Sequence, residues 1–359
     1  MKHGYRVLIH QDAHDMAARY LRTLRDGGAM GGHLRRVLRD TRLEPLSVED
    51  FLEQLVATKP PQIFAESAVH GDGTDWNQDE LSILGDIVVA VAVMAYDNGR
   101  HRRPEVHPRP IPATLLFVPG ALLANGRGQP PADEAEVTRD GQIDRDGYLR
   151  LYERRLLPAL TYAHDTSTAR GKRALITMPG LGCGQFAGRF KGRLGAVLDD
   201  TLVALLDRHG ATLGGIAALY FDPYDECSNH ESTIHTTKYM VRPLTLGNHD
   251  KPQLCTPESY AEAGDDFSDC DLYSVVAWDH VSWPGNDFYG GARSTDDGVK
   301  AAATSAMSTM TQVEGAYDPA AYKYQPPRPF QSWGDVVTER ELRMAVAGNL
   351  TMYPKTTSR

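Results

Sequence analysis

The sequence has few cysteines and no long apolar run, and both shortages narrow the class of protein. Its four cysteines show no CxxC spacing and no secretory apolar segment precedes them, which argues against a disulfide scaffold or a zinc ribbon. The most apolar run, residues 83–96, is interrupted by Asp86 and falls short of the roughly 20 residues that a membrane span needs. We therefore expect a protein of a reducing, cytoplasmic compartment without a membrane partner.

The sequence also lacks an excess of positive charge. Its 38 Lys and Arg residues against 47 Asp and Glu residues give a net charge of −9 at pH 7. A protein that binds duplex nucleic acid normally carries a basic face or tail, so that class of partner is not expected, although a compact anionic ligand remains open. The 359 residues, 41% of them hydrophobic, suffice for a globular protein with a full core.

Short apolar strands alternate with helical segments along the chain. Apolar runs predict strands at residues 5–9, 61–67, 114–119, 174–179, 215–221 and 272–278. Periodic apolar positions predict helices at 148–163, 189–208, from about 298 and at 336–347, with helix-like sequence before residue 57. Residues 79–99 fit a buried helix or a strand. The alternation predicts an α/β fold with a mostly parallel sheet covered on both faces, and such sheets bind ligands at the carboxyl ends of their strands.

The first unusual strand end is PGLGCGQFAG, residues 179–188, which contains four glycines between a predicted strand and a predicted helix. Backbone N–H groups in such a loop can approach an anion closely, and the helix dipole favours negative charge there. The segment predicts a diphosphate cradle, although a glycine-rich turn without a ligand explains it about as well. It also resembles the first motif of S-adenosylmethionine methyltransferases, but the preceding strand lacks the usual acidic residue and lies in mid-chain.

The second unusual strand end is rich in carboxylates. Asp279, Asp287, Asp296 and Asp297 follow the strand that ends at Trp278 and precede an alanine-rich helix. Taken singly, an aspartate at such a junction is more often a helix cap or a turn residue than a catalyst, and Asp297 with Thr295 could cap the helix. Several carboxylates beside aromatic side chains instead favour a site for a flat base or a sugar next to a reacting centre.

At these two loops the sequence resembles the macrodomain superfamily, whose members bind ADP-ribose. SVVAWDHVSWPGNDFYGG, residues 274–291, is similar to the strand and loop that hold the ribose, and GLGCGQFAG, residues 180–188, to the loop that holds the diphosphate. The two occur in reversed chain order, as in a permuted or rearranged macrodomain. The resemblance is greatest to the arginine-specific ADP-ribosyl hydrolase macrodomains of the MavL type, and extends more distantly to poly(ADP-ribose) glycohydrolases.

The resemblance implies a three-layer α/β, macrodomain-like fold with a mixed, mostly parallel sheet flanked by helices. Residues 106–359 would form the ADP-ribose-binding catalytic core with a C-terminal tail. Residues 1–105 would be an N-terminal extension or part of the same domain. The macrodomains of the MavL type are typified by a bacterial effector. The resemblance is therefore also compatible with delivery of the protein into the cytosol of another cell.

The resemblance also implies roles for individual residues. Asp287 and Asp297 would be catalytic, one holding the distal ribose or the guanidinium and the other activating water; which of them is the base stays open. Ligand binding is implied for residues of both loops: Asp279, Asn286, Gly290, Gly291, Asp296, Gly180, Gly182, Cys183, Gly184, Gln185 and Phe186. The scheme needs no metal and no cofactor, since ADP-ribose is ligand and product.

The implied function is hydrolytic removal of mono-ADP-ribose from arginine side chains of ADP-ribosylated proteins. The alternative is a non-catalytic ADP-ribose reader, because a reader needs the glycine-rich loop but no carboxylate pair. A poly(ADP-ribose) glycohydrolase is less favoured, because that family has a triple glycine followed by Gln-Glu-Glu, whereas here Asp296 and Asp297 follow Gly290 and Gly291.

Four further features are weaker signals. His10 and His14 have the spacing of helical metal ligands, but Ile9 ends a strand and no HExxH motif is present, so a metal site is not expected. Cys183 could be a nucleophile, but a small residue in a tight loop is favoured because no histidine lies nearby in the sequence. FDPYDEC at 221–227 and YKYQPPRPF at 322–330 fit either ligand contacts or a turn and a linker.

Overall fold

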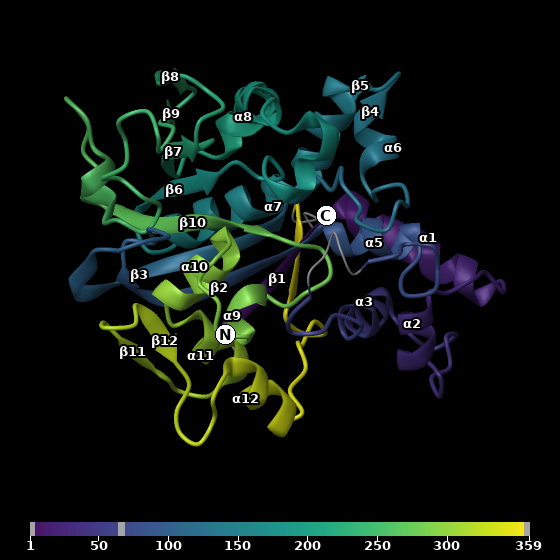
Figure 1. Ribbon diagram of the computed structural model, residues 1–359. Coiled ribbons are helices and arrows are strands. Elements are labelled where there is room, and N and C mark those ends of the chain that lie inside the picture. The colour runs from purple at the N-terminus through teal and green to yellow at the C-terminus, as the bar shows by residue number, and fades with distance from the viewer. Residues whose placement is uncertain (1–3, 64–68, 355–359) are drawn as a thin grey trace.

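The computed structural model describes residues 4–63 and 69–354 and is built around a nine-stranded mixed sheet (Figure 1). The strand order is β13-β1-β2-β3-β10-β6-β7-β9-β8. These strands are β1 (Tyr5–His10), β2 (Ile87–Asp97), β3 (Val106–Pro119), β6 (Arg173–Pro179), β7 (Ile216–Asp222), β8 (His230–Ile234), β9 (Thr237–Val241), β10 (Cys270–Trp278) and β13 (Leu350–Tyr353). Neighbours from β3 to β9 run parallel, as do β1 and β13, whereas β1 with β2, β2 with β3 and β8 with β9 are antiparallel.

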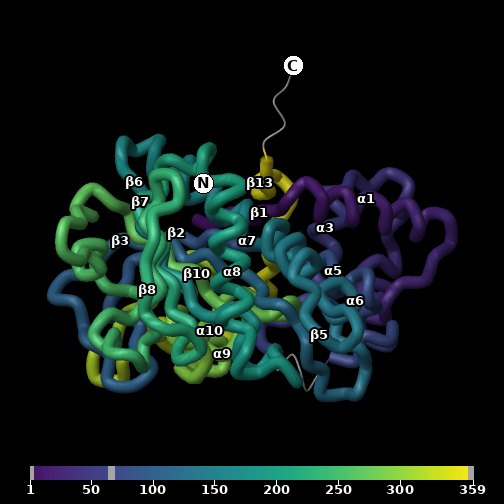
Figure 2. The backbone as a smooth tube through the Cα atoms, turned by 90° about the horizontal axis from the view of Figure 1, so that it is seen from above, coloured from purple at the N-terminus to yellow at the C-terminus, as the bar shows by residue number. Residues whose placement is uncertain are grey.

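Helices cover both faces of this sheet and make three layers (Figure 1). One face carries α7 (Arg145–Thr168) and α8 (Leu194–His209). The other carries α1 (Gln11–Arg25), α3 (Val48–Val56), α5 (Gln78–Gly85), α10 (Asp296–Ala303), α11 (Ala306–Thr311) and α12 (Trp333–Glu339). The shorter elements are α2 (Gly32–Val37), α6 (Glu134–Val137), α9 (Asn286–Tyr289) and the strand pairs β4 (Thr138–Arg139) with β5 (Gln142–Ile143) and β11 (Ala316–Asp318) with β12 (Lys323–Gln325). Figure 2 shows α1, α3 and α5 grouped at the end of the molecule opposite β8.

The sheet is apolar on both faces because it is buried on both. In β2, Val89 and Val91 belong to the core under α1, α3 and α10, whereas Val88 and Ala90 belong to the core under α7 and α8. Successive side chains of a strand point to opposite faces, so a strand buried on both sides reads as one continuous apolar run. The predicted α/β fold with a mostly parallel, doubly covered sheet is confirmed.

Most of the predicted elements are found, with differences at several places, and strand β13 has no counterpart among the predicted elements. Residues 79–99, which fit a helix or a strand from the sequence, contain all of α5 except its first residue and the whole of β2, separated by Asp86. The helix predicted at 336–347 is found only over residues 336–339 and is wrong beyond them, because α12 ends at Glu339 and Glu341 has a φ of +50°. Strands β8 and β9 lie in a segment that showed only irregular polar sequence. Residues 61–63 are not in a strand, and the rest of the strand predicted at 61–67 lies outside the described residues.

The two predicted regions of the chain contribute to one sheet. Strands β2 and β3 form an antiparallel pair on either side of residue 105, and β1 pairs with both β2 and β13. The assignment of residues 106–359 as a separate core stays a prediction. In the part of the chain that the structure describes, no helix has both the length and the apolar character of a membrane span.

Candidate functional site

A cavity of about 580 Å³ lies at the carboxyl ends of four neighbouring parallel strands, β3, β10, β6 and β7. Gly120 after β3, Gly180 after β6, Asp222 at the end of β7 and Asp279 after β10 all line it. Open α/β sheets bind ligands at this edge, and the volume suits a small molecule. The cavity is therefore the candidate functional site.

The loop after β6 passes so close to the loop after β3 that a glycine is required. Gly182 has a φ of +71°, and a Cβ at this position would lie 2.8 Å from the backbone N of Ala121. The Tyr152 hydroxyl of α7 ties the two loops together, since it donates to the Leu181 carbonyl at 2.8 Å and accepts from the Ala121 N–H at 3.1 Å. Gly184, in contrast, lines the cavity and has open space where a Cβ would point. The loop is thus held against the loop after β3 at Gly182, whereas Gly184 faces open space in the cavity.

Cys183 is buried within this loop, with its Sγ 3.6 Å from the Leu181 carbonyl. Burial, followed by the charge of Glu226, raises the pKa of the thiol. A thiol that stays protonated is a weak nucleophile, so its position favours the role of a small loop residue. Phe186, in the 3₁₀ helix η1 (Gln185–Phe190), packs edge-on against the His280 ring at 6.1 Å between ring centres. This contact joins the glycine-rich loop to the acidic loop.

Asp279 organises the acidic loop after β10. Its Oδ1 accepts hydrogen bonds from the N–H groups of Val281 at 3.1 Å and Ser282 at 2.9 Å, and its Oδ2 accepts one from Asn286 Nδ2 at 2.8 Å. Asn286 also pairs with both backbone groups of Ile63, at 2.7 and 2.8 Å. Burial raises the pKa of the Asp279 carboxyl. One side chain therefore links the end of β10, the start of α9 and a segment from the N-terminal third of the chain.

The two aspartates predicted to be catalytic both line the cavity, but their surroundings differ. Asp287 Oδ2 accepts a hydrogen bond from Ser294 Oγ at 2.9 Å. Asp297 Oδ1 accepts one from the Gly285 N–H at 2.8 Å, and its Oδ2 is buried without a hydrogen-bond partner among the described residues. Burial, followed by the charge of Asp279, raises the pKa of Asp297 well above its ordinary value. Two carboxyl groups in unlike environments are what a division into acid and base requires.

A chain of buried polar groups crosses from α10 to β7. Asp296 Oδ2 accepts hydrogen bonds from the Ala277 N–H at 2.8 Å and from the Lys300 ammonium at 3.1 Å. Lys300 also donates to Gln253 Oε1 at 2.7 Å, and Gln253 Nε2 lies 3.5 Å from Asp222 Oδ2. Burial raises the pKa of Asp222 and lowers that of Lys300. These contacts fix the far wall of the cavity.

The residues predicted for the site come together with two exceptions. Those that line the cavity are Asp279, Asn286, Asp287, Asp296, Asp297, Gly180, Gly182, Cys183, Gly184, Gln185 and Phe186. Gly290 and Gly291 follow α9 and do not belong to the described lining residues, and a Cβ on Gly290 would meet the Gln62 side chain at 2.7 Å. From the sequence, Thr295 and Asp297 could both cap the helix. Thr295 does cap α10, whereas the carboxyl of Asp297 accepts a hydrogen bond from the Gly285 N–H.

Several lining residues were missed or left open from the sequence. Asp222 and Tyr224 belong to the FDPYDEC segment, for which a ligand contact was one of two interpretations. Tyr224 has a φ of +64° and stays 61% exposed, a strained position for a large aromatic residue. Gln253, Lys300 and Arg100 carry no recognisable motif and reach the cavity only through the fold.

The two histidines considered as metal ligands have other partners. His10 Nδ1 accepts a hydrogen bond from the Asp12 N–H at 3.1 Å and caps α1. His14 lies within α1 and faces Glu49 at 3.6 Å. Within residues 4–63 and 69–354, no group of three or more His, Cys, Asp or Glu side chains is arranged to hold a metal ion.

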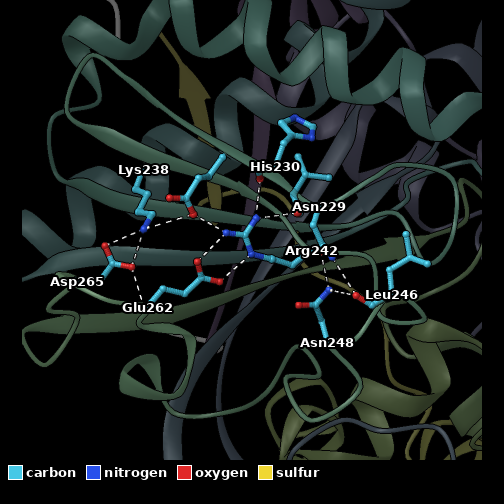
Figure 3. A network of polar contacts seen from close by, with 10 residues as sticks. Asn229, His230, Lys238, Arg242, Leu246, Asn248, Glu262 and Asp265 are labelled. Carbon is cyan, nitrogen blue, oxygen red and sulfur yellow. Dashed lines mark hydrogen bonds and ion pairs between the residues drawn. The ribbon is translucent and has the colours of Figure 1, made fainter.

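Ion pairs lie before and after the loop of residues 243–254, which carries Gln253 to the cavity, and Figure 3 shows them around Arg242 and Lys238. Arg242, after β9, donates to the Glu262 carboxylate through Nε and Nη2, each at 2.7 Å, and to the His230 carbonyl at 2.7 Å. Bidentate guanidinium–carboxylate pairs are strong and directional. Arg242 therefore joins β8, β9 and the segment before β10 around the start of this loop.

Comparison with known proteins agrees with the geometry. The family model described as "Macrodomain effector MavL" matches residues 5–330, a range that includes both loops, all four strands that end at the cavity and the N-terminal strands β1 and β2. A comparison with curated proteins finds no match. The family match covers most of the chain, and we conclude that the protein belongs to the MavL family of macrodomain effectors.

Proposed function

We propose that the protein is an ADP-ribosyl hydrolase that removes mono-ADP-ribose from arginine side chains of modified proteins. Membership of the MavL macrodomain family supports ADP-ribose binding or hydrolysis. The observation that carries the step from binding to hydrolysis is the pair of aspartates, Asp287 and Asp297, in one cavity but in unlike surroundings. A binding module would need the glycine-rich loop but no such pair.

In this proposal ADP-ribose spans the cavity between the two loops. The backbone N–H groups offered to the diphosphate are those of Gly182, Cys183, Gly184 and Gln185. Amides of a glycine-rich loop that precedes a helix are suited to an anion, and the open space at Gly184 supports this placement. Phe186 packs against the distal ribose, which brings C1″ towards the two aspartates.

The unlike environments divide the chemistry between acid and base. Because burial raises the pKa of Asp297 well above its ordinary value, we assign it as the general acid and Asp287 as the general base. Asp287 takes a proton from a water molecule whose oxygen bonds to C1″. The bond between C1″ and the guanidine nitrogen breaks, and the Asp297 proton goes to that nitrogen. The carboxylate of Asp287 also stabilises positive charge that develops on the ribose.

The charge of the cavity supports an arginine linkage. Asp287 lines the cavity on the side assigned to the distal ribose, and guanidinium groups pair well with carboxylates because their planar donor geometry matches two oxygens. We therefore expect arginine-linked substrates to be cleaved faster than serine-linked ones, which bring no positive charge.

The proposal is tested by incubating the protein with an arginine-ADP-ribosylated protein and measuring released ADP-ribose. Asp287→Asn and Asp297→Asn keep the side-chain shape but remove the acid–base function. Each should lower the release rate by at least about a hundredfold, the usual contribution of a general acid or base. Calorimetry with free ADP-ribose should still show binding by both variants.

The matched control is Asp269→Asn, which changes an exposed aspartate at the opposite end of β10 that pairs with Arg173. It should release ADP-ribose at the wild-type rate. Full activity in both site variants would refute the assignment. Binding without release by the wild-type protein would identify a reader instead.

A further inference from the structure

Lys59 is a buried lysine beside the site, and the proposed mechanism does not use it. It follows α3, is only 4% exposed, and places its Nζ 4.1 Å from the centre of the Trp278 ring. Its ammonium has no hydrogen-bond acceptor among the residues that the structure describes. The ring attracts the cation, but a buried charge is costly unless an opposite charge compensates it.

The negative charge that acts on Lys59 is that of Asp279, the residue next to Trp278. Burial lowers the pKa of Lys59 to about 7, and the negative charge of Asp279 opposes this shift. Burial raises the pKa of Asp279, and hydrogen bonds from Ser282 and Val281, followed by the charges of Lys59 and His280, oppose that shift. Asp297, which also faces this group, adds a negative field when ionised. Lys59 and His280 thus favour the ionised form of Asp279.

Backbone contacts hold the Lys59 segment against the acidic loop. Trp283 Nε1 donates to the Lys59 carbonyl at 2.9 Å, and the Trp283 N–H donates to the Pro60 carbonyl at 3.2 Å. Asn286 pairs with Ile63 and with Asp279. Segment 59–63 is therefore held at its start by Trp283 and at its end by Asn286. These contacts fix the position of Lys59 beside the acidic loop.

We propose that Lys59 is a positioning residue, whose ammonium, held over the Trp278 ring, stabilises the carboxylate of the next residue, Asp279, in its place at the base of the acidic loop. An ionised Asp279 accepts the three hydrogen bonds that order the turn at 281–282 and hold Asn286, the neighbour of Asp287. For its consequence on catalysis the inference rests on the proposed function, whereas the charge interaction itself does not. Packing alone does not explain a lysine here, because an apolar side chain of equal length would cover Trp278 without burying a charge.

The test compares the pH dependence of free ADP-ribose binding, by calorimetry, in Lys59→Met, Lys59→Arg and wild type. Methionine keeps the packing and removes the charge. The affinity for ADP-ribose should therefore begin to fall at a pH about one unit higher than in wild type. At a given pH within this acidic range, binding should be roughly tenfold weaker. Arginine keeps the charge and should leave this range in place. The control Lys172→Met removes a surface lysine paired with Asp271 and should match wild type. Superimposable curves for Lys59→Met and wild type would overturn the inference.

Amide hydrogen exchange provides a readout that needs neither activity nor ligand. In the free wild-type protein, the Val281 and Ser282 amides should lose their protection from exchange as the pH falls through the range in which ADP-ribose binding weakens. The exchange rates are first corrected for the intrinsic effect of pH. In Lys59→Met, or in Lys59→Gln if the methionine variant does not fold, the loss should occur at higher pH. An unchanged midpoint overturns the Lys59 assignment even if the wild type binds no ADP-ribose, a result that would by itself refute only the proposed function.

Discussion

Asp287 and Asp297 face one cavity from two helices, α9 and α10, and packing gives them different surroundings. The Asp297 carboxyl lies 2.8 Å from the Gly285 N–H on one side and against protein without a described partner on the other. The Asp287 carboxyl has the Ser294 hydroxyl beside it. The proposed mechanism therefore uses the same residue type as acid at one position and as base at the other, because burial changes the relative stability of the charged form.

The raised pKa of Asp297 leads to a prediction about stability. Because its pKa is higher in the folded than in the unfolded protein, the folded state binds the proton more tightly. The stability that this carboxyl supplies is complete below its ordinary value of 3.8 and is lost as the pH rises towards the folded pKa. Asp297→Asn does not titrate, so its melting temperature should exceed that of wild type near neutral pH, and the advantage should shrink near pH 4.

Thermal unfolding of both proteins at several pH values checks this prediction. A melting-temperature difference that stays constant across pH would show that Asp297 has no shifted pKa. In that case its assignment as the acid would lose its physical basis. Asp269→Asn, at the exposed end of β10, serves as the control for removing a carboxylate, and no gain in stability with pH is expected there.

At the scale of elements, the site depends on loops that approach one another closely. The loop after β6 touches the loop after β3 at Gly182, whose positive φ and close neighbour Ala121 leave no room for a side chain. The loop after β10 is held by Asp279 and Asn286. Because β3, β10 and β6 are adjacent and parallel, their loops meet at one edge, and the cavity lies among them.

Gly182→Ala should destabilise the protein and weaken ADP-ribose binding together. The added methyl group would meet the Ala121 backbone at 2.8 Å in a conformation that favours glycine, a strain of about 1–3 kcal/mol. Gly214→Ala is the matched control, since its Cβ would find its nearest neighbour, Thr236, at 3.8 Å. Denaturant unfolding and calorimetry measure the two effects. Wild-type stability in Gly182→Ala would contradict the close approach of the two loops.

Elements with a strong local signal could be predicted from the sequence, and those without one could not. The glycine-rich and acidic loops were found because glycines and carboxylates gathered at strand ends already point to a ligand. Lys300 and Gln253 were missed because their roles depend on contact between α10 and a loop 47 residues away in sequence. The helix predicted at 336–347 is wrong beyond residue 339 because tertiary packing, not periodicity, sets where α12 ends.

For the whole molecule, the N-terminal third is part of both the sheet and the site wall. Strands β1 and β2 extend the sheet beyond β3, and Ile63 pairs with Asn286 at the cavity. The sequence showed no motif in residues 1–105, because their contribution consists of ordinary core positions, the buried Lys59 and single lining residues such as Ile63 and Arg100. The fold, not the sequence pattern, connects them to the chemistry.

A fragment of residues 106–359 should not fold as the full chain does. It lacks β1 and β2, so β3 loses the antiparallel neighbour against which Leu115 and Phe117 pair, and the apolar edge is exposed. We expect no cooperative thermal transition by circular dichroism and no ADP-ribose binding, whereas the full chain shows both. A cooperatively unfolding, ligand-binding fragment would instead identify residues 1–105 as a dispensable extension.

The central claim is that this cavity cleaves the bond between C1″ of the ribose and the arginine side chain. Its most direct test is mass spectrometry of both products after the full-length protein is incubated with an arginine-ADP-ribosylated protein. The account predicts free ADP-ribose and an unmodified arginine with the wild type, and neither product with Asp297→Asn. Release of AMP with ribose phosphate left on the arginine, or no product at all, would contradict it.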